Sequence, residues 1–292
     1  MDITIRRAGP ADEAVCARLV YDAFKDVSER HGFTSGFATV EVARRVVRVF
    51  LGLDAMWSGA AEVDGRVVGS IFYDEGDPIH GVALVSVDPG TQRRGIGRRL
   101  MDAALARATN AAGVRLIQEA FNVHALGLYT SLGFEVKAPL ARIVGHPGPV
   151  PPGVAVRTIS REAVDECDRL YVRVQGWSRR VDLRDALGDF TGYAALRDGR
   201  IVACTYVLYA GVVAWAVAET DDDMMALLAG VRAAVRGPVG VNAPTGTAFF
   251  RRCLGLGFRV EKPLTLMARG GWRESRGSYL PDRKSTRLNS SH

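Results

Sequence analysis

The sequence is poor in several residue types, and each scarcity narrows what the protein can do. It has four cysteines in 292 residues, with no CxxC pair and no histidine at ligand spacing, so neither a disulfide framework nor a metal site is indicated. Isolated thiols are typical of a reducing compartment, and we expect a cytoplasmic protein without a metal. These cysteines are Cys16, Cys167, Cys204 and Cys253.

Lysine is equally scarce, since 34 of the 38 basic residues are arginine. The formal net charge is +6, but the basic residues are interleaved with 32 acidic ones along the whole chain. Nucleic-acid binding needs a concentrated basic surface, so we predict no nucleic-acid partner.

Signals for export and for membrane insertion are also missing. Residues 1–7 alternate like a first strand and lack the basic and then apolar pattern of a secretory leader. Residues 201–218 carry no charge and are long enough for a membrane helix. They are nevertheless rich in Val, Tyr, Thr and Trp, are interrupted by Gly211 and follow the turn Asp198-Gly199, which is typical of a buried hairpin. We therefore predict no membrane segment.

The apolar pattern switches repeatedly between strand and helix periodicity, which favours an α/β layer structure. The tight-turn dipeptide Asp64-Gly65 predicts a hairpin between two strands. We expect strands at residues 3–7, 60–63, 67–73, 82–87, 114–120 and 134–137, and helices at 11–25, 40–53, 95–112 and 125–132.

A proline-rich connection near residues 145–152 divides the chain into two similar halves. Three landmarks recur in the same order: residues 154–157 resemble 3–6, residues 198–202 resemble 64–68, and residues 256–258 resemble 132–134. We predict a duplicated architecture with domains at 1–145 and 152–271. Residues 283–292 have no periodicity and are interpreted as a non-native tail.

The sharpest local pattern is Gln92-Arg93-Arg94-Gly95-Ile96-Gly97, which lies between a strand and an amphipathic helix. Glycines let the backbone approach a ligand and direct several amide N–H groups into one concavity, where the helix dipole adds positive charge. Arg98 and Arg99 follow directly. This combination suits a diphosphate.

This pattern resembles the pyrophosphate loop of the GNAT superfamily of acyl-CoA-dependent N-acyltransferases, Gln/Arg-x-x-Gly-x-Gly/Ala. Residues 84–89 before it resemble that family's fourth strand, which splays from the next strand and offers backbone groups to the pantetheine arm. Asn122 and the segment 125–134, with Tyr129 before Leu-Gly-Phe, resemble the family's second contact region. The resemblance implies two tandem GNAT-like domains in an α/β (α+β mixed-sheet) fold, each with a twisted, mostly antiparallel sheet and helices on both faces.

What the resemblance implies for the site is binding of acetyl-CoA as acyl donor and transfer to an amine. Tyr129 would protonate the departing thiolate and the backbone of Val87 would stabilise the oxyanion. Glu119 is the first candidate for general base, ahead of His80, His124 and Glu75, or of a relaying water; His31 falls where such folds build the acceptor pocket. The expected coenzyme-binding residues are Val85, Ser86, Val87, Gln92, Arg93, Arg94, Gly95, Ile96, Gly97, Arg98 and Asn122.

The second half lacks the loop, because Asp221, Asp222 and Asp223 stand where phosphates would bind. Cys253 occupies the position of Tyr129 and is interpreted as a core residue. We therefore expect a degenerate second domain that covers the first or shapes its acceptor pocket. The acceptor is expected to be a small-molecule amine; a protein lysine or N-terminus, a non-catalytic acyl-CoA sensor and a homodimer remain open alternatives.

Overall fold

The protein is described here by a computed structural model that covers residues 2–208 and 211–282, so the expected tail at 283–292 lies outside the described residues. The first half contains β1 (Thr4–Arg7), η1 (Pro10–Asp12), α1 (Glu13–Arg30), α2 (Val40–Gly52), β2 (Met56–Val63), β3 (Arg66–Asp74), β4 (Ile79–Val87), η2 (Pro89–Thr91), α3 (Ile96–Leu105), η3 (Ala108–Asn110), β5 (Gly113–Glu119), α4 (Val123–Ser131) and β6 (Glu135–Gly145). The second half contains β7 (Val154–Thr158), η4 (Arg161–Ala163), α5 (Val164–Gln175), α6 (Arg180–Asp189), β8 (Thr191–Arg197), β9 (Arg200–Val207), β10 (Val213–Ala218), α7 (Asp221–Val235), β11 (Val239–Pro244), α8 (Ala248–Gly255), β12 (Arg259–Gly270) and β13 (Ser278–Leu280).

The expected hairpins form in both halves, and their turns have the same geometry. Asp64 and Gly65 have φ values of 50° and 73°, and Asp198 and Gly199 have φ values of 50° and 76°. Two successive positive φ angles match the right-handed twist of the flanking strands, which explains the Asp-Gly pair at each turn. Residues 201–207 and 213–218 belong to the antiparallel strands β9 and β10, as predicted. Among the described residues, no helix is both long and apolar enough to cross a membrane.

Two elements differ most in length from the prediction. Helix α3 ends at Leu105 instead of continuing to residue 112. Arg107, two residues on, forms an ion pair with Glu75 at 2.6 Å and stacks over Trp57, so tertiary contacts rather than helix periodicity set its position. Strand β6 runs to Gly145, eight residues beyond the predicted strand, because it has a pairing partner on each edge.

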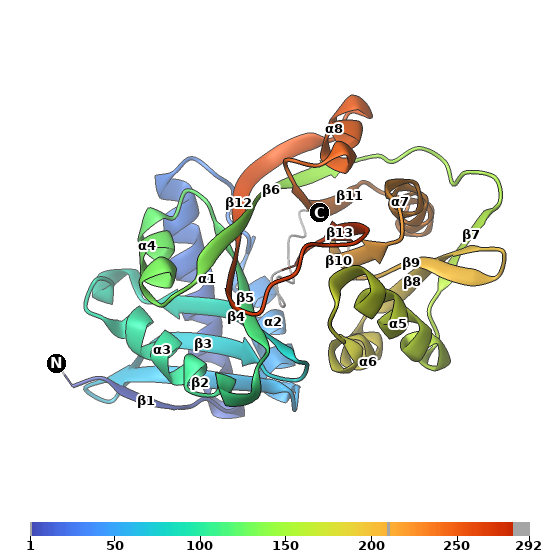
Figure 1. Cartoon of the computed structure of the whole chain (residues 1–292). Helices are drawn as coiled ribbons and strands as arrows, with labels where there is room; N and C mark the ends of the chain where they lie inside the picture. The colour runs from blue at the N-terminus through green and yellow to red at the C-terminus, as the bar shows by residue number, and fades with distance from the viewer. Residues whose placement is uncertain (1, 209–210, 283–292) are drawn as a thin grey trace.

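The two halves exchange strands within one sheet. Its order is β1-β2-β3-β4-β5-β12-β6-β11, so β12 of the second half lies between β5 and β6 of the first. Reciprocally, β6 of the first half pairs with β11 of the second. Figure 1 shows β6 and β12 arching together from one half to the other. The domain boundary near residues 145–152 therefore stays a prediction. Strands from the two sides of this boundary are hydrogen-bonded to one another.

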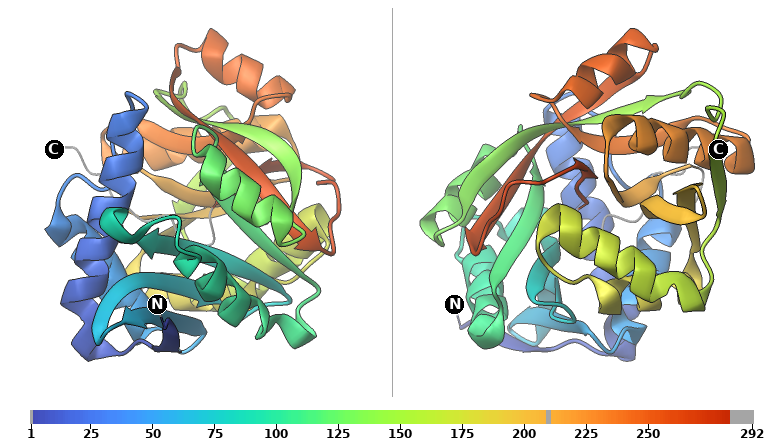
Figure 2. Two further views of the ribbon diagram at one scale, coloured as in Figure 1. Left: turned by 90° about the vertical axis from the view of Figure 1, so that its left-hand side faces the viewer. Right: turned by 45° about the vertical axis from the view of Figure 1, so that its right-hand side comes forward.

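Helices cover both faces of the first half, as predicted. Alternate residues of β3 point to opposite faces: Phe72 packs in the core beneath α1 and α2, and Ile71 packs in the core beneath α3. The second half repeats this arrangement with the sheet β13-β10-β9-β8-β7, with α5 and α6 on one face and α7 on the other. The two views in Figure 2 show these layers and the shared strands that connect them.

Candidate active site

A cleft of about 480 Å³ opens where β4 and β5 separate. These strands run parallel and are paired only at their first residues, Ile79 with Gly113 through Gly81 with Arg115. Beyond that point they diverge, which confirms the expected splay. The cleft is lined by Ala23, Phe24, Val27, Arg30, His31, Val82, Ala83, Val85, Val87, Gln92, Arg93, Gly95, Ile96, Gly97, Arg98, Leu116, Ile117, Gln118, Glu119, Asn122, Val123, His124, Ala125, Leu128 and Tyr129.

The loop before α3 presents unused amide donors at one end of this cleft. Gly95 caps the helix with φ +82°, and Arg93 also has a positive φ, +65°. Within residues 2–208 and 211–282, no group accepts a hydrogen bond from the backbone N–H groups of residues 92–98. Consecutive free N–H groups at a helix N-terminus form a concave anion-binding surface. The loop therefore has the geometry that a diphosphate requires.

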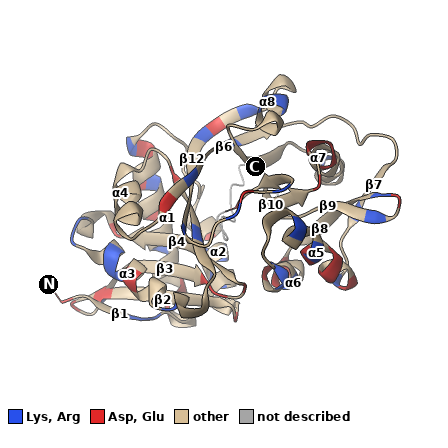
Figure 3. Cartoon of the chain, in the orientation of Figure 1, with Lys and Arg blue, Asp and Glu red and all other residues tan. Residues whose placement is uncertain are grey.

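Only some of the arginines in and after this loop line the cleft. Arg93 and Arg98 line the cleft, where Arg93 donates to Nε2 of His124 at 3.1 Å and Arg98 donates to Oγ of Ser131 at 2.5 Å. These two bonds connect the loop and the first turn of α3 to the two ends of α4. Arg99 instead donates to the carbonyl of Ile3 and fastens α3 to the first strand. Arg94 is exposed and does not line the cleft. Figure 3 shows the positive charge concentrated on α3.

The last residues of β4 contribute alternately to the sides of the cleft. Val85 and Val87 line the cleft, whereas the Ser86 side chain is buried and lies outside the lining. This division follows from the period of two in a strand. A role for Ser86 in coenzyme binding would therefore involve its backbone. The side-chain amide of Gln92 donates to the carbonyl of Val87 at 3.4 Å and holds the loop against this strand.

Asn122 and Tyr129 both line the cleft, from the start and the last turns of α4. Oδ1 of Asn122 accepts from the backbone N–H of Ala125 at 3.1 Å, so this residue also caps α4. The half-buried ring of Tyr129 lies edge-on to Phe134, with centroids 6.1 Å apart. Phe134 fixes the ring's orientation, while the side chain remains part of the cleft surface.

Glu119 also lines the cleft, and it forms an ion pair that the sequence did not indicate. Its side chain is 4% exposed, and its Oε1 accepts from Nζ of Lys262 at 2.5 Å. Lys262 belongs to β12, the strand that the second half inserts beside β5. No local pattern marks Lys262, because its partner is 143 positions away. Only the strand exchange brings the two together.

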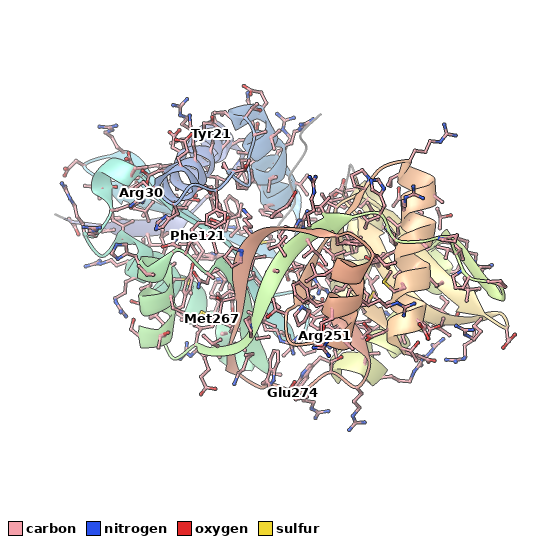
Figure 4. All side chains as sticks on the ribbon, turned by 90° about the horizontal axis from the view of Figure 1, so that it is seen from above. Tyr21, Arg30, Phe121, Arg251, Met267 and Glu274 are labelled. Carbon is pink, nitrogen blue, oxygen red and sulfur yellow. The ribbon has the colours of Figure 1, made fainter. Side chains whose placement is uncertain are left out.

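The other candidate bases occupy different places. His80 is buried outside the cleft, and its Nδ1 shares a hydrogen bond of 3.0 Å with the hydroxyl of Tyr73. Glu75 also lies outside the cleft lining and is paired with Arg107. His31 and His124 do line it. The ring centroids of His31 and Phe121 are 5.4 Å apart. Figure 4 labels Phe121 and the neighbouring Arg30 on this side of the first half.

In the second half, the chain itself occupies the equivalent strand edge. β10 corresponds to β4, and β13 pairs with it from Ala216–Leu280 to Ala218–Ser278. β13 is anchored by Arg179, which is buried between Asp182 and Asp282 at 2.8 and 2.7 Å. A pantetheine arm would need the hydrogen-bonding edge that β13 already uses.

The helix after β10 is also unsuited to phosphate. Thr220 caps α7 by accepting from the amide of Asp223 at 3.1 Å, and three aspartates fill the first turn. Figure 3 shows the resulting negative charge at α7. Carboxylates at this position repel phosphate and already use the positive end of the helix dipole. Cys253 is fully buried, and burial raises the pKa of its thiol to about 12.

Part of the chain is similar in sequence to known acetyltransferases. Residues 54–136 match the family model described as an acetyltransferase (GNAT) domain. A mycothiol acetyltransferase of Nocardia farcinica is 35% identical over 133 residues, which are 44% of this chain and 43% of that protein. The alignment thus spans less than half of the curated relative.

Solved structures are similar over almost the whole chain. A candidate acetyltransferase of Pyrococcus horikoshii aligns with a TM-score of 0.72 at 17% identity, covering 94% of this chain and 91% of that one. A tandem GNAT protein from the clavulanic acid biosynthesis pathway aligns with a TM-score of 0.59 at 16% identity, covering 95% and 99%. At such low identity, the structural similarity shows the fold alone. It confirms the predicted fold of two GNAT-like halves in tandem.

Proposed function

We propose that this protein is an N-acetyltransferase that transfers an acetyl group from acetyl-CoA to a primary amine of a small molecule. Its first half contains the residues that match the GNAT acetyltransferase domain. The observation that carries this proposal is the row of unused backbone N–H groups from residue 92 to residue 98 at one end of the cleft. Tyr129 and Glu119, two side chains suited to proton transfer, line the same cleft.

The residues of the loop suit the diphosphate of coenzyme A. The amides of residues 92–98 would bind phosphate oxygens, and the guanidinium groups of Arg93 and Arg98 would add charge-assisted hydrogen bonds. The open edges of β4 and β5 would then hold the pantetheine arm between Val85, Val87 and Asn122. This placement directs the thioester toward Tyr129 and Glu119.

The reaction we propose is direct attack. The neutral amine nitrogen forms a bond to the thioester carbonyl carbon, and the carbon–sulfur bond breaks as the tetrahedral intermediate collapses. The backbone N–H of Val87 or its neighbour stabilises the oxyanion, and the Tyr129 hydroxyl donates its proton to the departing thiolate. The attacking nitrogen loses its proton to Glu119 or to a water molecule bound beside it.

A small acceptor is favoured over a protein one for two reasons. The acceptor end of the cleft is bounded by α1, and Phe33 of the segment after α1 stacks on Phe121 with centroids 4.3 Å apart. The curated relative is named a mycothiol acetyltransferase. From that name we infer for this chain only that its acceptor is a small molecule. We propose a cytoplasmic location on the basis of four unpaired, buried thiols. A homodimer stays an open proposal.

The decisive experiment measures release of the free coenzyme thiol from acetyl-CoA in the presence of single amines, amino sugars, polyamines, aminoglycosides and lysine peptides. Acceptor-dependent release with a small amine would support the proposal. Activity with peptides alone would establish the protein acetyltransferase alternative. Tight acetyl-CoA binding by calorimetry with no turnover on any acceptor would favour the non-catalytic sensor and overturn the proposed reaction.

A further inference from the structure

The charges around the cleft are unbalanced in a way that bears on the acceptor. Of the described residues that line it, Glu119 is the only one with a carboxylate, whereas Arg30, Arg93 and Arg98 are cationic. Arg93 and Arg98 belong to the end that suits phosphate. The acceptor end therefore depends on one acidic side chain for any attraction of positive charge.

That acidic side chain is already neutralised. Nζ of Lys262 lies 2.5 Å from Oε1 of Glu119, and both side chains are almost fully buried. Nζ also lies close to Gly36, in the segment that joins α1 to α2, since a Cβ at Gly36 would be 3.9 Å from it. Arg30 is likewise paired, with Asp26 at 2.6 Å. The acceptor end thus offers matched ion pairs rather than surplus negative charge.

A carboxylate without a nearby cation attracts a polycation more strongly than a monoamine, because the Coulomb attraction grows with the number of positive charges on the ligand. A monoamine depends less on this attraction and needs mainly a hydrogen-bond acceptor for its nitrogen. The pairing of Glu119 with Lys262 therefore discriminates between acceptors by their charge. It leaves a carboxylate oxygen near the cleft but cancels the long-range attraction of that carboxylate for cationic acceptors.

We infer that Lys262, delivered by the exchanged strand β12, is a specificity-determining residue that restricts the acceptor to amines of low positive charge and rejects polyamines and aminoglycosides. This inference rests on the proposed function. It assigns to the second half a direct part in acceptor choice, through a single side chain that never needs to touch the acetyl group.

The test compares the ratio of kcat/KM for glucosamine to kcat/KM for spermidine in four proteins. The wild type should favour glucosamine. Lys262→Met should shift the ratio toward spermidine by about tenfold or more, mainly through a lower KM for spermidine, because the carboxylate then lacks its counter-charge. Lys262→Arg should restore the wild-type ratio. Lys137→Met, which removes a lysine paired with the exposed Glu135, is the matched control and should leave the ratio unchanged.

Two outcomes overturn the inference, and neither can be attributed to a misfolded variant. A wild type that acetylates spermidine at least as efficiently as glucosamine contradicts it, as does a Lys262→Met variant that is folded by circular dichroism but has an unchanged ratio. If no amine supports turnover, the proposed function fails instead. Calorimetry with spermidine in the presence of coenzyme A then tests the charge effect alone: binding to Lys262→Met and none to the wild type supports it, and equal binding contradicts it.

Discussion

Tyr129 and Cys253 occupy the same position in the two halves. The carbonyl oxygen of each accepts from the amide of the phenylalanine five residues later, Phe134 at 3.0 Å and Phe258 at 3.1 Å. Gly133 and Gly257 precede these phenylalanines with φ values of 84° and 86°. The backbone of the helix terminus is thus preserved, while the side chain differs: a phenol at the surface of a cleft in one half, a buried thiol in the other.

Replacement of Tyr129 by phenylalanine tests the proposed acid. The ring and its contact with Phe134 are kept, so the fold and acetyl-CoA affinity should be unchanged. Loss of a general acid typically slows turnover by about a hundredfold to ten-thousandfold, and we expect kcat to fall within that range. Steady-state kinetics with thiol detection measures it. Wild-type kcat in the variant at every pH would exclude Tyr129 from proton transfer.

The thiols should be unreactive in the native protein. Burial raises the pKa of Cys16 to about 11 and that of Cys253 to about 12, so the reactive thiolate is scarce at pH 8 and becomes abundant only near those values. We expect no rapid reaction with a disulfide reagent at pH 8, and reaction of all four thiols after unfolding in guanidinium. Fast labelling of Cys253 in the native protein, identified by mass spectrometry of the labelled peptide, would show that Cys253 is not a core residue.

The backbone of the loop can be tested at Gly95. A valine there must adopt φ +82°, which costs roughly 1–2 kcal/mol for an L-residue, so Gly95→Val should distort the loop and abolish acetyl-CoA binding. Gly199→Val is the matched control, because that glycine has φ +76° in a hairpin of the second half and is equally open. Calorimetry should detect coenzyme binding only in the control. Tight binding by Gly95→Val would refute the loop assignment.

The full chain should bind one acetyl-CoA. β13 occupies the edge of β10, and three aspartates fill the start of α7, so the second half lacks both a free strand edge and an anion site. Calorimetry of the intact protein should yield a stoichiometry near one, and Gly95→Val should remove the whole signal. A second binding event that survives Gly95→Val would contradict the assignment of the second half as degenerate.

The two halves should not fold separately. A fragment of residues 1–150 lacks β12, so the edge of β5 and one edge of β6 become exposed, together with Glu119 without its counter-ion. Open strand edges promote aggregation, and we expect this fragment to elute as aggregate in size-exclusion chromatography. Coexpression with residues 151–292 should restore a soluble complex. A monomeric fragment with a cooperative thermal transition would show that the exchanged strand is dispensable.

Features that depend on neighbouring residues could be predicted from the chain alone. The hairpins at Asp64-Gly65 and Asp198-Gly199 and the loop that ends at Gly95 are governed by local backbone preferences and by hydrogen bonds that span a few residues. The GNAT resemblance was recognised from such segments. The repeated landmarks likewise indicated two related halves, since each recurs within its own local context.

Which strands pair across those halves was decided by tertiary structure. The alternating residues of β12 are compatible with several sheet edges, and nothing near residue 262 specifies β5 as the neighbour. In the folded protein, β6 pairs with β12 on one edge and with β11 on the other. Contacts between Lys262 and Glu119, and between β13 and β10, therefore arise from long-range packing, which local propensity does not encode.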